Sequence, residues 1–285
     1  MIKKEMHKIN VADIRLGLPE FEVKEKQIDD NKYSYFEAGE GKPLILLPGF
    51  PFGKELYSLV IPGLALNKKV IALDLPGWGE SGYKQEITYS GINKWLYKYV
   101  NSESRSIDLF GYSFGGSIAL RFINDYPELV DRVSVYSPAI KFSRYMDPIK
   151  SIFLQFANMS PKIRQIFFKE LISGGGNLHK IMFGVEMNIQ NPYHQKLYES
   201  LQKVRLEPFF ETLKTIFGTD LAPDLSGITK EVNIVTGEKD YIKTDSFEAI
   251  KLLKKSHLIV IPRVTHNFID ENPAKFQEVL SKIFN

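Results

Sequence analysis

Hydrophobic and polar residues alternate along the chain in a pattern that predicts strands and helices in turn. Residues 21–28 and 32–38 look like the two strands of a hairpin around Asp29-Asp30-Asn31. Short apolar runs typical of buried strands follow near 44–47, 70–73, 107–110, 132–136, 231–236 and 257–261. Helical patterns lie between or after them, near 54–66, 88–101, 114–126 and 273–283. This order predicts an α/β fold with a mainly parallel eight-stranded sheet and helices on both of its faces.

The alternation of strands and helices is interrupted once. Residues 139–225 contain helical runs, many phenylalanines and no convincing strand. We therefore expect a core made of residues 21–138 and 226–285, with a helical cap inserted at 139–225. Residues 1–20 are polar with a weak helical pattern, and we expect an N-terminal extension there.

Composition narrows the class of protein. The 285 residues suit one large domain or a core plus an insertion, and 44% hydrophobic with 25% charged residues is ordinary for a soluble globular protein. The net charge is only +3 and the sequence has no basic block, so we expect no nucleic-acid partner. The absence of cysteine excludes disulfides, a thiol nucleophile and thiolate metal sites. No apolar segment reaches a membrane-spanning length, so we expect a cytoplasmic protein without stable membrane insertion.

The stretch Gly111-Tyr112-Ser113-Phe114-Gly115-Gly116 carries the strongest chemical signal. An apolar strand leads into it and a helical run leads out, and this context makes Gly-x-Ser-x-Gly a nucleophile elbow. The glycines on either side remove the Cβ atoms that would collide in so sharp a turn, while the serine is held in strained backbone geometry above the sheet. The alternative is a glycine-rich turn that carries a surface serine. We expect Ser113 to be the nucleophile.

A nucleophilic serine needs a general base. In proteins with a Gly-x-Ser-x-Gly nucleophile elbow, the order along the chain is serine, acid, histidine. His266 lies on the loop between the last strand and the terminal helix, where a base can reach the carboxyl end of the sheet. The remaining histidines lie in the N-terminal extension, in the helical insertion, or at the wrong end of the last strand: His7, His179, His194 and His257. We therefore predict His266 as the base.

The acid that orients the base is predicted to be Asp240, on the loop after the strand near 231–236. Glu238 and Asp245 are the nearest alternatives. A position after the preceding strand is disfavoured because residues 137–141 contain no carboxylate. Asp74 precedes the serine in sequence, and we interpret it as a carboxylate that organises its own loop.

Two backbone N–H groups are needed to stabilise an oxyanion. Phe114 follows the serine at the start of a helix, and Phe50 lies in the Pro-Gly loop after the strand near 44–47. We expect these two N–H groups to form the oxyanion hole. The alternative for Phe50 is an ordinary Pro-Gly turn.

Four motifs in this order resemble the α/β-hydrolase-fold serine hydrolases, in particular their capped, esterase-like branch. They are Leu47-Pro48-Gly49-Phe50-Pro51, Asp74-Leu75-Pro76-Gly77-Trp78-Gly79-Glu80-Ser81, Gly111 to Gly116, and Gly237 to Asp240 with His266. The sequence departs from the family at Pro48, where relatives usually carry a histidine that supports the oxyanion loop. Serine at the elbow argues against the haloalkane dehalogenase and epoxide hydrolase branches, which use aspartate there.

The resemblance implies a carboxylesterase-like serine hydrolase that acts on an ester or similar small acyl substrate, without metal or organic cofactor, as a monomer or homodimer. Carbon–carbon-bond hydrolases, lactonases and aminopeptidases share the triad and remain alternatives. An aminopeptidase needs acidic groups in the insertion, and a carbon–carbon hydrolase needs polar groups such as arginines there; the candidates are Glu170, Glu186, Glu199 and Glu207, and Arg144, Arg164 and Arg205. A ligand-binding protein that retains the fold is the non-enzymatic alternative.

Overall fold

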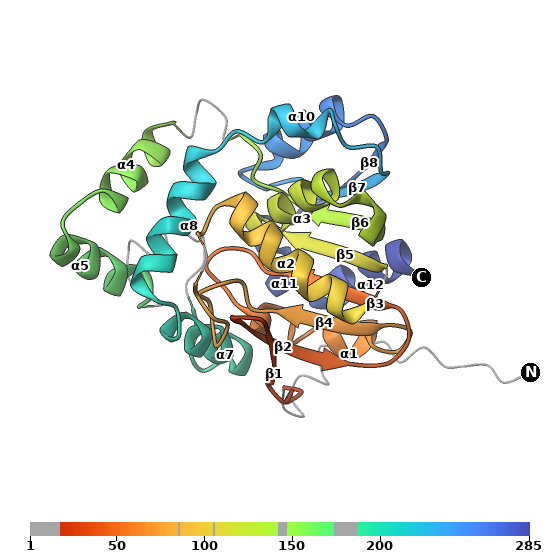
Figure 1. The fold of residues 1–285 in the computed structure, drawn as a ribbon, viewed down its shortest axis with the longest axis horizontal. Helices are drawn as coiled ribbons and strands as arrows, with labels where there is room; N and C mark the ends of the chain where they lie inside the picture. The colour runs from red at the N-terminus through yellow and green to blue at the C-terminus, as the bar shows by residue number, and fades with distance from the viewer. Residues whose placement is uncertain (1–17, 85, 105, 142–146, 174–186) are drawn as a thin grey trace, which may run out of the picture.

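The computed structural model describes residues 18–84, 86–104, 106–141, 147–173 and 187–285. Within these ranges the chain forms one eight-stranded sheet with the strand order β1-β2-β4-β3-β5-β6-β7-β8 (Figure 1). The strands are β1 (Lys24–Ile28), β2 (Asn31–Ala38), β3 (Pro43–Leu47), β4 (Lys69–Leu73), β5 (Ile107–Tyr112), β6 (Val130–Tyr136), β7 (Val232–Gly237) and β8 (Ser256–Ile261). β2 pairs antiparallel with β1 and β4, and all other pairs are parallel. The predicted α/β class and the mainly parallel sheet are confirmed.

Helices cover both faces of this sheet because successive strand residues point to opposite sides. In β3, Ile45 belongs to one apolar core, while Leu44 and Leu46 belong to the other. The first core is shared with α2 (Tyr89–Glu103), α3 (Phe114–Asp125) and α10 (Lys243–Leu252). The second is shared with α1 (Ile61–Leu64), α11 (Phe268–Glu271) and α12 (Pro273–Phe284). Both faces are therefore buried, and the carboxyl ends of the strands are the place left for a site.

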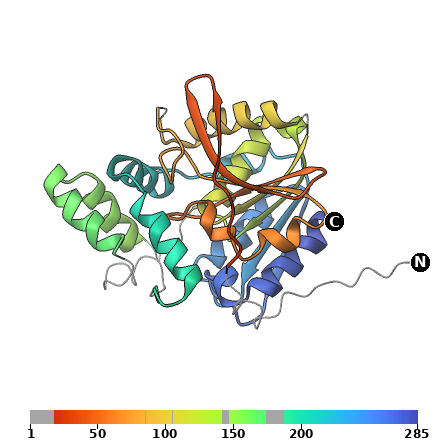
Figure 2. The same cartoon turned by 90° about the horizontal axis from the view of Figure 1, so that it is seen from below.

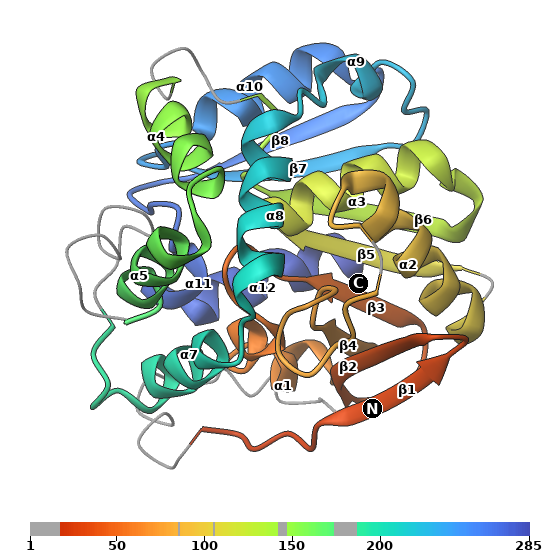
Figure 3. The same cartoon turned by 60° about the vertical axis from the view of Figure 1, so that its left-hand side comes forward.

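Between β6 and β7 the described chain is helical, as the pattern predicts. The inserted helices are α4 (Asp147–Ala157), α5 (Pro161–Leu171), α7 (Pro192–Gln202), α8 (Leu206–Gly218) and α9 (Ala222–Leu225). Helix α8 runs past the carboxyl ends of the strands, and α4 and α5 lie beyond it on the side away from the sheet (Figures 1, 2 and 3). Phenylalanines join them: the Phe153 ring stacks on Phe217 of α8, and Phe168 of α5 meets Phe209 of α8.

One predicted helix is wrong in detail. The segment near 54–66 forms a 3-10 turn at Lys54–Tyr57 and a separate short helix, α1, rather than one helix. Pro62 explains the break, because proline has no N–H to donate to the preceding turn and fits only in the first turn of a new helix. The 3-10 turn brings Lys54 into the interior, where it is fully buried.

The predicted hairpin is confirmed over most of its length. β1 begins at Lys24, three residues later than predicted, and Ile28 pairs with Asn31 across a two-residue turn. Of the predicted N-terminal extension, residues 1–17 lie outside the described residues.

Candidate active site

Ser113 occupies the one-residue turn between β5 and α3, in the backbone geometry expected of a nucleophile elbow. Its φ of +51° lies in the left-handed region, a conformation that costs about 1–3 kcal/mol for a residue with a side chain. A Cβ on Gly111 would lie 2.2 Å from the carbonyl oxygen of Gly115, and one on Gly115 would lie 2.2 Å from that of Leu47. Only glycine therefore fits at either position, and the tight packing holds the serine in its strained turn.

His266 lies on the loop between β8 and α11 and faces the serine. Its Nε2 is 3.0 Å from Ser113 Oγ, and its Nδ1 is 2.9 Å from Asp240 Oδ2. We call these three side chains, Ser113, His266 and Asp240, the relay. His266 is 8% exposed and Asp240 is 2% exposed, so the histidine and the acid are largely shielded from water. The structure thus brings together the three side chains that the sequence assigns to nucleophile, base and acid.

Asp240 is held so that its charge faces the histidine. Its second oxygen, Oδ1, accepts the N–H of Ile242 at 2.9 Å. Burial alone would raise the pKa of the Asp240 carboxyl, but the facing His266 outweighs it and the pKa is lowered. An ionised Asp240 holds the imidazole proton on Nδ1 and leaves Nε2 free to accept the serine proton.

Two tyrosines that the sequence analysis did not single out fix the histidine loop. The Tyr112 hydroxyl donates to the backbone carbonyl of His266, and the Tyr136 hydroxyl donates to that of Thr265 at 2.6 Å. The two rings stack with centroids 4.7 Å apart at the carboxyl ends of β5 and β6. The sequence does show a tyrosine directly before the elbow serine. Its hydrogen-bond partner, however, lies 154 residues away in the chain, so the sequence alone does not indicate the contact.

The two expected oxyanion donors lie next to Ser113. Phe114 is the first residue of α3. On the other side, a Cβ on Gly49 would lie 3.2 Å from Ser113 Cβ, which places the peptide between Gly49 and Phe50 beside the serine. The Phe50 ring packs against Trp78 and against Phe209 of α8, at centroid distances of 5.3 and 4.9 Å. One edge of this loop therefore meets an inserted helix directly.

The alternative acids engage other groups. Glu238 accepts the N–H of Arg263 at 2.8 Å. Asp245 is buried and accepts the N–H groups of Ile140 and Lys141 at 2.8 and 2.9 Å, where the chain leaves β6 for the inserted helices. Burial raises the pKa of Asp245 to about 6.

Asp74 does organise its loop, as the sequence analysis expected. Its side chain accepts the N–H groups of Lys54 and Glu80, and its backbone carbonyl accepts the Ser81 hydroxyl.

Two of the other histidines have acidic partners. Most of the described charged residues considered in the insertion contact other groups, and Glu170 is exposed on α5. His194 lies 3.0 Å from Asp270, and the exposed His257 lies 2.9 Å from Glu231. Other contacts of the weighed residues are Arg164 with Glu207 at 2.8 Å, Arg205 with the carbonyl of Ser81, and Glu199 with Gln195 at 3.1 Å. Four residues weighed above lie outside the described residues: His7, Arg144, His179 and Glu186.

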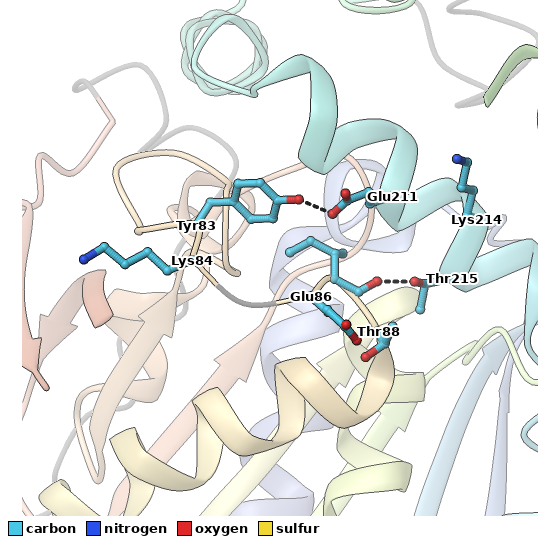
Figure 4. Close-up of a pocket in the computed structure, with 8 residues that line it drawn as sticks. Tyr83, Lys84, Glu86, Thr88, Glu211, Lys214 and Thr215 are labelled. Carbon is cyan, nitrogen blue, oxygen red and sulfur yellow. Dashed lines mark hydrogen bonds between the residues drawn. The ribbon is translucent and has the colours of Figure 1, made fainter. Parts of the chain in front are cut away.

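A pocket of about 470 Å³ opens between α8 and the loop that precedes α2 (Figure 4). Tyr83 reaches across it to Glu211, and Thr215 of α8 donates to the carbonyl of Ile87. The other residues that line the pocket are Lys84, Glu86, Thr88 and Lys214. Ser113, His266 and Asp240 do not line this pocket, which is therefore separate from them.

The part of the chain that the structure describes contains no group of three His, Asp or Glu side chains that could hold a metal ion. In those same residues, no helix is long and apolar enough to cross a membrane.

A mainly parallel sheet with a serine on the sharp turn between a strand and a helix defines the α/β-hydrolase class of folds. The sequence matches the alpha/beta hydrolase family over residues 44–279, and the chain therefore belongs to that family. No curated protein matches the sequence.

Solved structures with the same fold carry several different activities. An esterase from Exiguobacterium antarcticum is 18% identical, with a TM-score of 0.72, over 90% of this chain and 96% of that one. An enol-lactonase from Burkholderia xenovorans is 12% identical, with a TM-score of 0.72, over 91% and 99%. An epoxide hydrolase is 18% identical, with a TM-score of 0.75, over 93% and 99%. At these identities the likeness establishes the fold alone.

Proposed function

We propose that this protein is a serine hydrolase that cleaves an ester or similar small acyl substrate through an acyl-enzyme on Ser113. The observation that carries the proposal is the continuous relay in which Ser113 Oγ lies 3.0 Å from His266 Nε2 and His266 Nδ1 lies 2.9 Å from Asp240. A strained, glycine-flanked serine with a base and an orienting carboxylate in reach is the arrangement that acyl transfer requires.

The reaction follows from this geometry. His266 Nε2 takes the Ser113 proton as Oγ attacks the substrate carbonyl, and Asp240 stabilises the imidazolium that forms. The N–H groups of Phe50 and Phe114 hold the oxyanion of the tetrahedral intermediate. His266 then gives its proton to the leaving group, and the carbon–oxygen bond to that group breaks. Water, activated by the same base, attacks the acyl-enzyme and releases the acid.

The inserted helices act in this proposal as a cap over the cleft, and residues 21–138 and 226–285 form the core. Helix α8 runs past the carboxyl ends of the strands (Figure 3), the edge of the sheet at which Ser113 and His266 follow β5 and β8. Phe209 of α8 packs on Phe50 of the adjacent loop. An apolar surface at this place excludes water and suits a substrate of modest size with an apolar portion.

Burst kinetics with p-nitrophenyl acetate test the proposal. An acyl-enzyme that forms faster than it hydrolyses releases about one equivalent of p-nitrophenol per site before the steady state. Ser113→Ala should abolish both the burst and the turnover. A panel of short esters, lactones and aminoacyl arylamides then separates the esterase from the lactonase and the aminopeptidase. A folded wild-type protein with neither burst nor turnover on any member of the panel would contradict the proposal and favour a ligand-binding role.

A further inference from the structure

A buried lysine lies four residues after Phe50, on the loop that is proposed to form one side of the oxyanion hole. Lys54 has no exposed surface. A buried ammonium is costly unless it is paired, so its partners define what it does. The nearest are Asp74, Glu80 and Glu55, whose oxygens lie 2.6, 2.5 and 3.4 Å from Nζ.

Lys54 holds Asp74 at two points. Its backbone N–H donates to Asp74 Oδ1 at 2.9 Å, and its ammonium donates to Asp74 Oδ2 at 2.6 Å. Lys54 thus donates to both oxygens of the fully buried Asp74 carboxylate, and these bonds fix the backbone of Lys54 as well as its side chain. The turn before it is also closed, because Phe52 N–H donates to the carbonyl of Gly49 at 2.9 Å. The peptide that carries the proposed oxyanion donor is therefore tethered, through Phe52 and Lys54, to the loop after β4.

The same cluster extends to the inserted helices. Glu80 shares its oxygens between Lys54 and Lys203, the residue after α7, which lies 2.6 Å from Oε1. Beside it, Gly53 N–H donates to Ser200 Oγ of α7 at 3.2 Å. A Cβ on Gly53 would lie 2.5 Å from Asp74 Oδ1, so the contact leaves no room for a side chain. The oxyanion loop, the loop after β4 and helix α7 therefore meet here. The contacts of Gly53 and Lys54 are buried, and the Glu80–Lys203 pair lies at the surface.

The electrostatics fit a permanently charged anchor. Burial alone would lower the pKa of the Lys54 ammonium, but the surrounding carboxylates outweigh it and raise the pKa. Burial would likewise raise the pKa of Glu80, yet its hydrogen bonds to Lys203 and Lys54 lower it to about 2. Around neutral pH Glu80 therefore stays ionised and paired with Lys54 and Lys203, whereas burial and the neighbouring Glu55 raise the pKa of the Asp74 carboxyl to about 7.

We propose that Lys54 is a positioning residue for the reaction, whose buried ammonium holds the oxyanion loop in register with Ser113 and couples that loop to the inserted helices through Glu80 and Lys203. This inference rests on the proposed function, because it assigns Lys54 to the oxyanion hole of that reaction. Lys54 acts through the backbone of the loop and does not touch the substrate.

The rate of fluorophosphonate labelling measures this role. In that reaction Ser113 Oγ forms a bond to phosphorus, the phosphorus–fluorine bond breaks, fluoride leaves, and His266 takes the serine proton. The phosphoryl oxygen occupies the oxyanion hole in the transition state, so a displaced loop slows labelling. Lys54→Met removes the ammonium and keeps the side-chain length. We expect the labelling rate and kcat for p-nitrophenyl acetate to fall about 10- to 100-fold, with KM changed less than threefold.

Lys68→Met is the matched control. Lys68 is 7% exposed, and its ammonium lies 3.0 Å from the fully buried Asp108 near the start of β5. The Lys68→Met substitution removes the same kind of buried ion pair, but at the end of the sheet opposite to Ser113. Both variants should melt at a lower temperature than wild type, but only Lys54→Met should lose labelling rate.

The outcomes separate the two proposals. If wild type itself is not labelled, the proposed function fails. If wild type is labelled and folded Lys54→Met is labelled at the wild-type rate, or Lys68→Met slows labelling as much, the positioning role is refuted. Should Lys54→Met not fold, Glu80→Gln carries the test, since it keeps its shape and weakens the hold on the ammonium. A labelling rate at least threefold below wild type then supports the role, and an unchanged rate overturns it.

Discussion

Asp240→Asn should leave the fold intact and remove most of the turnover. Asp240 Oδ1 accepts the Ile242 N–H at 2.9 Å, and Oδ2 faces His266 Nδ1 at 2.9 Å. An asparagine that keeps its carbonyl oxygen towards Ile242 turns its NH2 group towards the imidazole. His266 Nδ1 must then accept a hydrogen bond, so the ring proton moves to Nε2. In that tautomer Nε2 cannot accept the proton of Ser113.

The expected loss is large because the wrong tautomer stops the first step. The corresponding aspartate-to-asparagine change in a serine protease lowers kcat by about 10⁴-fold while the geometry stays intact. We expect a fall of about 10³- to 10⁴-fold here, which corresponds to about 4–5.5 kcal/mol of transition-state stabilisation. The residual rate would come from the oxyanion donors and from substrate binding.

The assay is kcat for p-nitrophenyl acetate, with circular dichroism and thermal melting to show that the variant is folded. Asp245→Asn is the matched control, because Asp245 is equally buried, was the rival acid in sequence, and binds Ile140 and Lys141 instead of the histidine. Its kcat should stay within about threefold of wild type. The reasoning is refuted if folded Asp240→Asn keeps more than a tenth of wild-type kcat, or if Asp245→Asn loses as much.

Three further predictions use other contacts. Tyr112→Phe removes the hydrogen bond to the His266 carbonyl. We expect kcat to fall about 3- to 10-fold and the free energy of unfolding to fall by about 1–2 kcal/mol. Unchanged kinetics and stability would show that the histidine loop needs no such hydrogen bond. Burial raises the pKa of Asp245 from 3.8 to about 6, so the folded state binds this proton more tightly than the unfolded state, and stability falls as pH rises from about 4 to 6. Denaturant titrations measure the free energy of unfolding of wild type minus that of Asp245→Asn. This difference should decrease by up to about 3 kcal/mol over that window and stay constant above pH 7. A difference that is constant at every pH would contradict the raised pKa. Phe209→Ala empties a fully buried site against Phe50 and Phe168 and should cost about 3–5 kcal/mol in the same titrations, whereas a cost below 1 kcal/mol would mean that α8 packs loosely there.

Local sequence patterns predicted the elements around the elbow because the turn is dictated locally. Glycine is required at positions 111 and 115 by contacts with backbone atoms, and that requirement is visible in the sequence as Gly-x-Ser-x-Gly. The strands that flank it are apolar runs bounded by turn residues, which is the pattern of buried parallel strands. The histidine and the acid were then placed by their position after successive strands.

Tertiary contacts decided what the sequence could not show. Lys54 reads as a surface residue in a helical pattern, yet Pro62 breaks that helix and the lysine is fully buried against Asp74. Helix α10 was not predicted, because its sequence KTDSFEAIKL has too few apolar residues to mark a buried face. The contact between Tyr112 and the histidine loop joins residues 154 apart, and no local pattern encodes such a pair.

The most direct test of the central claim is to treat the folded wild-type protein with a fluorophosphonate and to measure intact mass and the modified peptide. The account predicts one adduct per chain, on Ser113, that is absent from Ser113→Ala and strongly reduced in His266→Ala, because His266 Nε2 lies 3.0 Å from the serine oxygen and removes its proton. No adduct on folded wild type, or an adduct that persists in Ser113→Ala, would contradict it.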